Sequence, residues 1–117
     1  MRVGVIDDDE GMRDSLGALL QAHGLEVCLF GSVEDALAEG DKLFALSALI
    51  VDQHLPGLSG LDLIRRVADH DIATVLISAQ LDNKLKAEAL KAGARAALGK
   101  PLDAGLLLAA VNSGRYA

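Results

Sequence analysis

The sequence predicts an α/β fold, a doubly wound parallel sheet of five strands with helices on both faces. Short apolar runs alternate with helical patterns five times along the chain, and this strict alternation is typical of parallel sheets. Two of the runs, ALIV at 48–51 and TVLI at 74–77, are apolar throughout, as expected for strands buried on both faces. Because 117 residues suit one domain, we expect residues 1–117 to form a single domain in which 112–117 are a tail or the start of a linker.

The first two strand–helix units have clear signals. RVGVI at 2–6 predicts a buried strand, and apolar residues at helical spacing predict a helix over 10–24. LEVCLF at 25–30 predicts the second strand. Ser32 is a favourable N-cap residue, and it predicts a short helix over 32–40.

The last three units follow the same pattern. ALSALIVD at 45–52 contains the third strand, IATVLIS at 72–78 is the fourth, and RAALG at 95–99 predicts a weak, alanine-rich fifth strand. The helices that follow these strands are predicted at 59–69, 82–94 and 103–113. The first of these helices has four apolar residues at helical spacing, namely Leu61, Leu63, Ile64 and Val67.

Composition and charge exclude several classes of protein. The chain is 51% hydrophobic but has one Tyr, two Phe and no Trp, so its core must be aliphatic. A net charge of −6 does not suit the binding of nucleic-acid phosphates. Cys28 is the single cysteine, which excludes an internal disulfide, and its apolar surroundings predict a buried thiol. The chain shows neither a signal-peptide pattern nor an apolar run of membrane-spanning length, so we expect a cytoplasmic domain without membrane contact.

Residues that can carry chemistry follow four of the five predicted strands. In open parallel sheets, ligands bind outside the carboxyl ends of the strands, so these positions should share one edge. The residues at these ends are Asp7, Asp8 and Asp9 after the first strand, Asp52 after the third, Ser78 after the fourth and Lys100 after the fifth. The sequence therefore predicts a site at which carboxylates, a hydroxyl and an ammonium meet.

Three neighbouring carboxylates repel one another, and a hard divalent cation such as Mg²⁺ would remove that cost. An aspartate can also attack phosphorus to give an acyl phosphate. The added negative charge could then be stabilised by the Lys100 ammonium and the Ser78 hydroxyl.

Other polar residues near the ends of the predicted helices have simpler interpretations. Asp9 and Glu10 fall in the first turn of the first helix, where acidic residues interact well with the helix dipole, and we do not expect them to bind metal. His23 and His70 lie near the ends of helices, where we expect contact with backbone carbonyls rather than with metal.

Four motifs in this order resemble the receiver domain of two-component signalling, over residues 2 to about 113. They are VIDDDE, VDQHLPGLSG, VLISA and GKP, each at the end of a predicted strand. Within that family, the amino-acid sequences of the first two motifs look most like those of receivers of the nitrogen-fixation regulator type. The resemblance implies a flavodoxin-like strand order 2-1-3-4-5 and a cis Lys100–Pro101 peptide.

The resemblance also implies roles for the residues at this edge. Asp52 would accept a phosphoryl group from a sensor histidine kinase, with Ser78 and Lys100 beside it. The implied Mg²⁺ ligands are the carboxylates of Asp7, Asp8 and Asp52 and the backbone carbonyl of His54. The domain would thus be a signalling module that phosphorylates and dephosphorylates itself with Mg²⁺, rather than a metabolic enzyme.

Four further positions would modulate this switch. In the family, an aromatic residue stands three positions before the lysine and rotates inward on activation, but this chain has Ala97 there. Either backbone shifts of the loop before the helix at 82–94 carry the signal, or the switch is muted. His54 and Gln80 correspond to positions that tune the lifetime of the acyl phosphate, and the small Ala79 leaves room for the phosphoryl group.

Several functions compete at this stage. The family's output surface, often used for homodimers, corresponds to residues 82–113. One alternative is a degenerate receiver that only binds partner proteins, which Ala97 favours. A phosphatase of the haloacid dehalogenase kind would need a second aspartate where His54 stands. A flavin or nucleotide binder would need a glycine-rich phosphate loop, and the chain has none.

Overall fold

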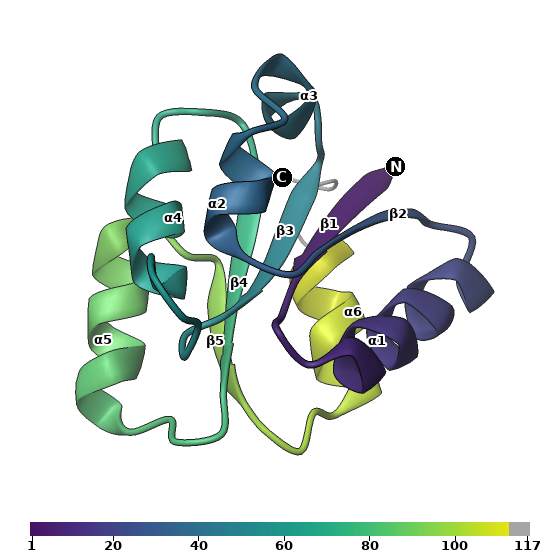
Figure 1. Cartoon of the computed structure of the whole chain (residues 1–117). Helices are drawn as coiled ribbons and strands as arrows, with labels where there is room; N and C mark the ends of the chain where they lie inside the picture. The colour runs from purple at the N-terminus through teal and green to yellow at the C-terminus, as the bar shows by residue number, and fades with distance from the viewer. Residues whose placement is uncertain (113–117) are drawn as a thin grey trace.

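A five-stranded parallel sheet forms the centre of the computed structural model, which describes residues 1–112. The strand order is β2-β1-β3-β4-β5, so the predicted fold class and the strand order implied by the resemblance are both confirmed (Figure 1). The strands are β1 (Arg2–Ile6), β2 (Glu26–Phe30), β3 (Ala48–Asp52), β4 (Ala73–Ser78) and β5 (Ala96–Gly99). All four pairings between neighbouring strands are parallel, so every strand has its carboxyl end at the same edge.

Helices cover both faces of the sheet (Figure 1). They are α1 (Glu10–Ala22), α2 (Val33–Leu37), α3 (Asp41–Phe44), α4 (Gly60–Val67), α5 (Asn83–Ala92) and α6 (Ala104–Asn112). One face packs against α1 and α6, and the other against α2, α3, α4 and α5. Asn112, the first residue of the tail expected at 112–117, belongs to α6. Residues 113–117, with Tyr116, lie outside the described residues.

The short helix α3 is a difference from the sequence prediction. The helix expected over 32–40 ends at Leu37, and a separate four-residue turn follows Gly40, which has a φ of 60°. A single helical turn is too short to show the periodicity by which helices are recognised in a sequence. The third strand accordingly begins at Ala48, inside the predicted range 45–52.

The core is aliphatic and divided by the sheet into two clusters. Successive residues of β3 alternate between them, with Leu49 in one cluster and Ile50 in the other, as the apolar strands predict. The four apolar residues expected on α4 are all buried. Cys28, expected to be buried, is only half-buried because it lies on β2, an edge strand with a neighbour on one side.

Several helices begin with the side-chain caps that the sequence suggests. Asp9 accepts a hydrogen bond from the Met12 N–H and Ser32 accepts one from the Asp35 N–H.

Among the described residues, no helix is both long enough and apolar enough to cross a membrane.

Candidate functional site

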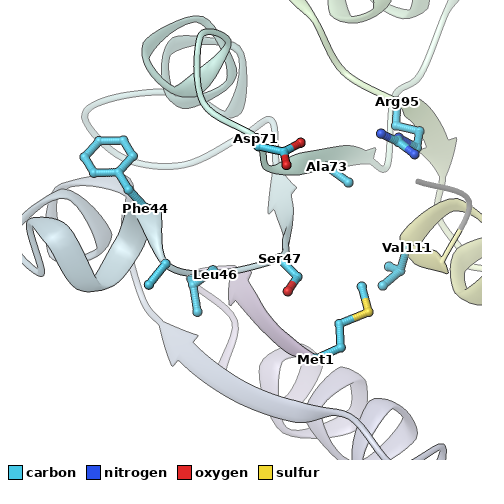
Figure 2. A pocket seen from close by; sticks show the side chains of 9 residues that line it. Met1, Phe44, Leu46, Ser47, Asp71, Ala73, Arg95 and Val111 are labelled. Carbon is cyan, nitrogen blue, oxygen red and sulfur yellow. The ribbon is translucent and has the colours of Figure 1, made fainter. Parts of the chain in front are cut away.

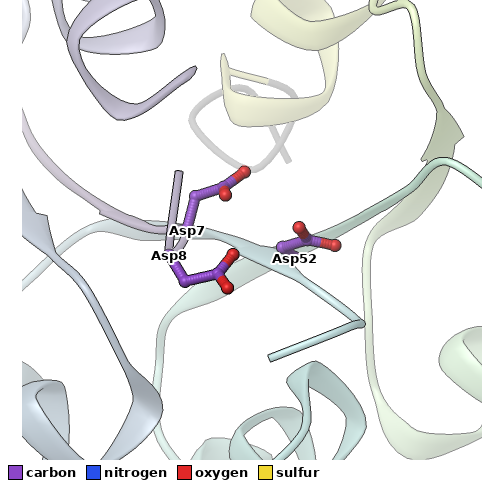
Figure 3. A group of neighbouring side chains, drawn as sticks. All are labelled: Asp7, Asp8 and Asp52. Atoms are coloured by element: carbon purple, nitrogen blue, oxygen red, sulfur yellow. The ribbon is translucent and has the colours of Figure 1, made fainter. Parts of the chain in front are cut away.

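Three carboxylates meet at the carboxyl edge of the sheet. Because β1 pairs with β3 so that Ile6 lies opposite Val51, Asp7 and Asp52 follow side by side. One oxygen from each of Asp7, Asp8 and Asp52 lies within 4.8 Å of the others (Figure 3). Asp7 is 0% exposed and Asp52 is 6% exposed, whereas Asp8 is exposed. This oxygen-rich set, open to water on one side, fits the needs of a hard divalent cation such as Mg²⁺.

Lys100 is the cation that contacts the two buried carboxylates. Its Nζ lies 3.0 Å from Asp52 Oδ2 and 3.2 Å from Asp7 Oδ2. Burial alone lowers the pKa of the Lys100 ammonium, but the hydrogen bonds and charges of Asp52 and Asp7 outweigh burial and raise the pKa above 10.5. One ammonium among three carboxylates leaves negative charge at the site, which suits a further cation.

Backbone groups fix the remaining carboxylate oxygens. The Asp9 N–H donates to Asp7 Oδ1 at 3.0 Å, and the His54 N–H donates to Asp52 Oδ1 at 3.2 Å. The His54 side chain is exposed beside the site. Arg13, which the sequence did not single out, donates from Nη1 to the Asp7 carbonyl at 2.8 Å. Because Arg13 lies one turn into the helix that follows the acidic run, its contact with that run could have been predicted from the sequence.

The hydroxyl of Ser78 lies at the end of the neighbouring strand. Ser78 is 0% exposed and its Oγ accepts a hydrogen bond from the Gln80 N–H at 3.1 Å. The Lys100 N–H donates to the Ser78 carbonyl, so the two residues are linked through the backbone. Ala79 and Gln80 are exposed in the loop beyond β4. The structure thus places the predicted residues at one edge, as parallel strands require.

Ala97 lies in the core rather than at the edge. It is 5% exposed, pairs with Leu76 of β4, and belongs to the cluster on the α4 and α5 side. Leu81 and Leu85, which are half-buried, pack against the same cluster. Position 97 therefore has no aromatic ring that could rotate.

The Lys100–Pro101 peptide is cis, as the resemblance implies.

Comparison with known proteins gives a consistent picture. The family model of the response regulator receiver domain matches residues 3–112. The transcriptional regulatory protein FixJ of Azorhizobium caulinodans is 35% identical over 113 residues, a match that covers 95% of this chain and 53% of that protein. The chain thus spans about half the length of this relative.

Solved structures agree with this match. The crystal structure of FixJ-N has a TM-score of 0.86 and 29% identity, and the match covers 98% of this chain and 93% of that one. A response regulator from Burkholderia pseudomallei, solved with a phosphorylated aspartic acid, calcium ion and citrate, has a TM-score of 0.83 and 29% identity. That match covers 98% of this chain and 69% of the other.

Proposed function

The chain belongs to the response regulator receiver family, and from that premise we propose that it accepts a phosphoryl group on the Asp52 carboxylate with the help of Mg²⁺. The donor would be the phosphohistidine of a sensor histidine kinase. The observation that carries the proposal is a nearly buried Asp52 whose carboxylate contacts Lys100 at 3.0 Å and lies within 4.8 Å of two further carboxylates. Residues 1–117 would act as one signalling domain that does not itself contact nucleic acid.

The residues at this edge suit phosphoryl transfer. An Asp52 oxygen attacks phosphorus, a P–O bond forms, and the bond from phosphorus to the donor nitrogen breaks with its electron pair leaving on the imidazole. Mg²⁺, when bound, would neutralise the negative charge that gathers on the phosphoryl oxygens. Its ligands would be the carboxylates of Asp7, Asp8 and Asp52 and the backbone carbonyl of His54. Lys100 would stabilise the added charge, and the Ser78 hydroxyl would donate a hydrogen bond to a phosphoryl oxygen.

The Burkholderia pseudomallei response regulator supports this proposal, since it was solved with a phosphorylated aspartic acid and a calcium ion. Calcium, like magnesium, prefers carboxylate and carbonyl oxygens. Phosphorylation of an aspartate, as found in that related structure, is the same modification that we propose for Asp52.

The route from the site to an output surface must work without an aromatic ring. Ala97 is buried among aliphatic residues, so we propose that the loop after Ser78 carries the change, through the hydrogen bond between Ser78 and Gln80. The output surface would lie on residues 82–113, where Leu90 and Leu106 are 47% and 60% exposed, and where a second copy could bind.

A receiver that only binds partner proteins is the second candidate function. The observation that favours it is Ala97, since a switch that rotates a ring cannot operate there. Such a domain would keep the fold and the partner surface but would take up no phosphoryl group.

The first experiment separates these two functions. The chain is incubated with Mg²⁺ and acetyl phosphate, and its intact mass is measured beside Asp52→Asn. A gain of one phosphoryl mass that needs both Mg²⁺ and Asp52 is expected. If no mass is gained and Mg²⁺ does not bind, the domain acts by binding alone.

The lifetime of the acyl phosphate provides a second test. We propose that the exposed side chains of His54 and Gln80 set this lifetime, and that Ala79 leaves space for the phosphoryl group. The double variant His54→Ala, Gln80→Ala should therefore change the rate of dephosphorylation, followed by intact mass after donor removal. An unchanged rate would remove both residues from this role.

A further inference from the structure

The loop between β3 and α4 determines how Asp52 is presented. The loop runs from Gln53 to Ser59 and includes Gly57, which has a φ of 78°. The His54 N–H, which donates to Asp52 Oδ1 at 3.2 Å, belongs to this loop. Since the loop is neither helix nor strand, the position of that N–H depends on the other hydrogen bonds that the loop makes.

Two side-chain oxygens hold this loop at separate points. Glu34 of α2 accepts a hydrogen bond from the Leu58 N–H at 3.0 Å, across 24 residues of sequence. Gln53, directly after Asp52, accepts one through Oε1 from the Leu61 N–H in the first turn of α4, at 2.9 Å. The first bond ties the loop to another element, and the second closes the loop on itself.

Two glycines show what lies close to the loop and to the start of α4. A side chain at Gly57 would overlap the Glu34 carboxylate. A side chain at Gly60 would come within 2.7 Å of the Asp52 carbonyl oxygen and of Leu76. The Glu34 carboxylate therefore lies directly against Gly57 of the loop, and the first residue of α4 lies against the carboxyl end of β3.

We propose that Glu34 and Gln53 are positioning residues, whose side-chain oxygens hold the loop so that the His54 backbone faces Asp52. This proposal rests on the proposed function. A carboxylate oxygen is a good acceptor for a backbone N–H, and the amide oxygen of a glutamine at position 34 could fill most of the same role. Because Glu34 is exposed, losing its bond leaves the Leu58 N–H to water, so the loop loosens while the fold remains stable.

The test compares three variants of exposed glutamates in the chain. Glu34→Ala removes both the charge and the acceptor, whereas Glu34→Gln removes the charge but keeps an acceptor oxygen. Glu39→Ala removes a charge just beyond α2, from a side chain that forms no hydrogen bond or ion pair within residues 1–112. The readouts are the rate of phosphorylation by acetyl phosphate with Mg²⁺, the hydrogen exchange of the His54 and Leu58 amides, and the midpoint of thermal unfolding.

We expect Glu34→Ala to slow phosphorylation about three- to tenfold, the range that one lost hydrogen bond allows. Exchange of both amides should accelerate while the thermal midpoint stays close to that of the wild type. Glu34→Gln should retain most of the rate, and Glu39→Ala should behave as wild type. Gln53→Met, which keeps the side-chain volume without an acceptor, should slow phosphorylation in the same way.

Other outcomes would overturn the proposal. If Glu34→Ala is folded and is phosphorylated at the wild-type rate, Glu34 does not position the loop. If Glu34→Gln and Glu39→Ala slow the reaction as much as Glu34→Ala, the loss of charge is the cause. If the wild type takes up no phosphoryl group, the proposed function fails by itself, and His54 exchange still decides whether Glu34 holds the loop.

Discussion

The two edges of the sheet both carry polar side chains, but carboxylates are buried at one edge, whereas the polar side chains that line a hollow at the other are exposed. At the carboxyl edge, Asp7 and Asp52 lie side by side and are buried (Figure 3). Both carboxylates contact the Lys100 ammonium. At the amino edge, a hollow of about 430 Å³ is lined by residues that include Ser47 and Asp71 (Figure 2). Both of these polar residues are exposed to water.

The proposed function places the chemistry at the edge with buried charge rather than at the edge with open space. Burying a carboxylate costs free energy unless a cation or hydrogen bonds compensate, so a buried acidic pair at a strand end marks a candidate functional site. The chain also begins α1 and α4 just beyond the carboxyl ends of β1 and β3, and helix N-termini favour negative charge. The hollow at the amino edge has space but no buried charge among the described residues that line it.

The largest expected effect comes from the lysines of the two edges. Lys100→Met leaves two buried carboxylates without their cation, and the free energy of unfolding should fall by about 3 kcal/mol. Lys42→Met, an exposed substitution in α3 near the amino edge, should change it by less than about 0.5 kcal/mol. Urea unfolding of both variants measures the difference.

The pH dependence of the Lys100 effect has a definite sign. The folded-state pKa of Lys100 lies above 10.5, so its contribution to stability is complete below pH 10.5 and is lost as pH rises through the folded-state value. The gap between wild type and Lys100→Met should stay constant from about pH 7 to about pH 9 and shrink above 10.5. A gap that widens at alkaline pH would contradict this role.

The next largest effect is expected when two exposed aspartates, one at each edge, are changed and phosphoryl uptake is compared. Asp8→Asn removes a proposed metal ligand, and phosphoryl uptake from acetyl phosphate should fall about 100-fold at low Mg²⁺. The reason is that losing even a residue that hydrogen-bonds to a metal ligand lowers metal affinity or activity by about 10- to 100-fold. Asp71→Asn, in the hollow of the amino edge, should leave the rate unchanged. Equal losses in both variants would mean that net charge, rather than ligation, controls the reaction.

The sequence predicted the carboxyl edge well because parallel strands bring their ends together whatever the loops do. Asp7, Asp8, Asp52 and Lys100 could be placed from their positions after strands alone. Glu34 could not, because its bond to Leu58 depends on the conformation of a loop 24 residues away.

Two of the three histidines, His23 and His70, illustrate the same limit. His23 Nδ1 lies 3.0 Å from the Leu19 carbonyl, as its place at a helix end predicts. His70 was expected to contact a carbonyl, and that prediction was wrong for its ring, which stacks on Phe44 with centroids 4.0 Å apart. Phe44 belongs to α3, the one helix whose signal in the sequence was too short to detect.

The smallest expected effect compares two serines. Ser59 begins α4 next to the proposed site, where its Oγ accepts from the Asp62 N–H and its own N–H donates to the Asp62 carboxylate. The backbone N–H of Ser59, and then its side chain, hold the pKa of Asp62 below its ordinary value of 3.8. Ser59→Ala removes the hydroxyl cap and should cost about 1 kcal/mol of unfolding free energy, measured at neutral pH.

The matched change at the amino edge is Ser47→Ala, from an exposed side chain that makes no hydrogen bond within residues 1–112, and its cost should stay below about 0.5 kcal/mol. The Ser59 cap also fixes where the loop after Asp52 ends, so Ser59→Ala should loosen the His54 amide in hydrogen exchange, whereas Ser47→Ala should not. If the two serines cost the same and neither alters that amide, order at the carboxyl edge does not depend on how α4 begins. The hydrogen bonds of Glu34 and Gln53 would then account for the geometry at Asp52.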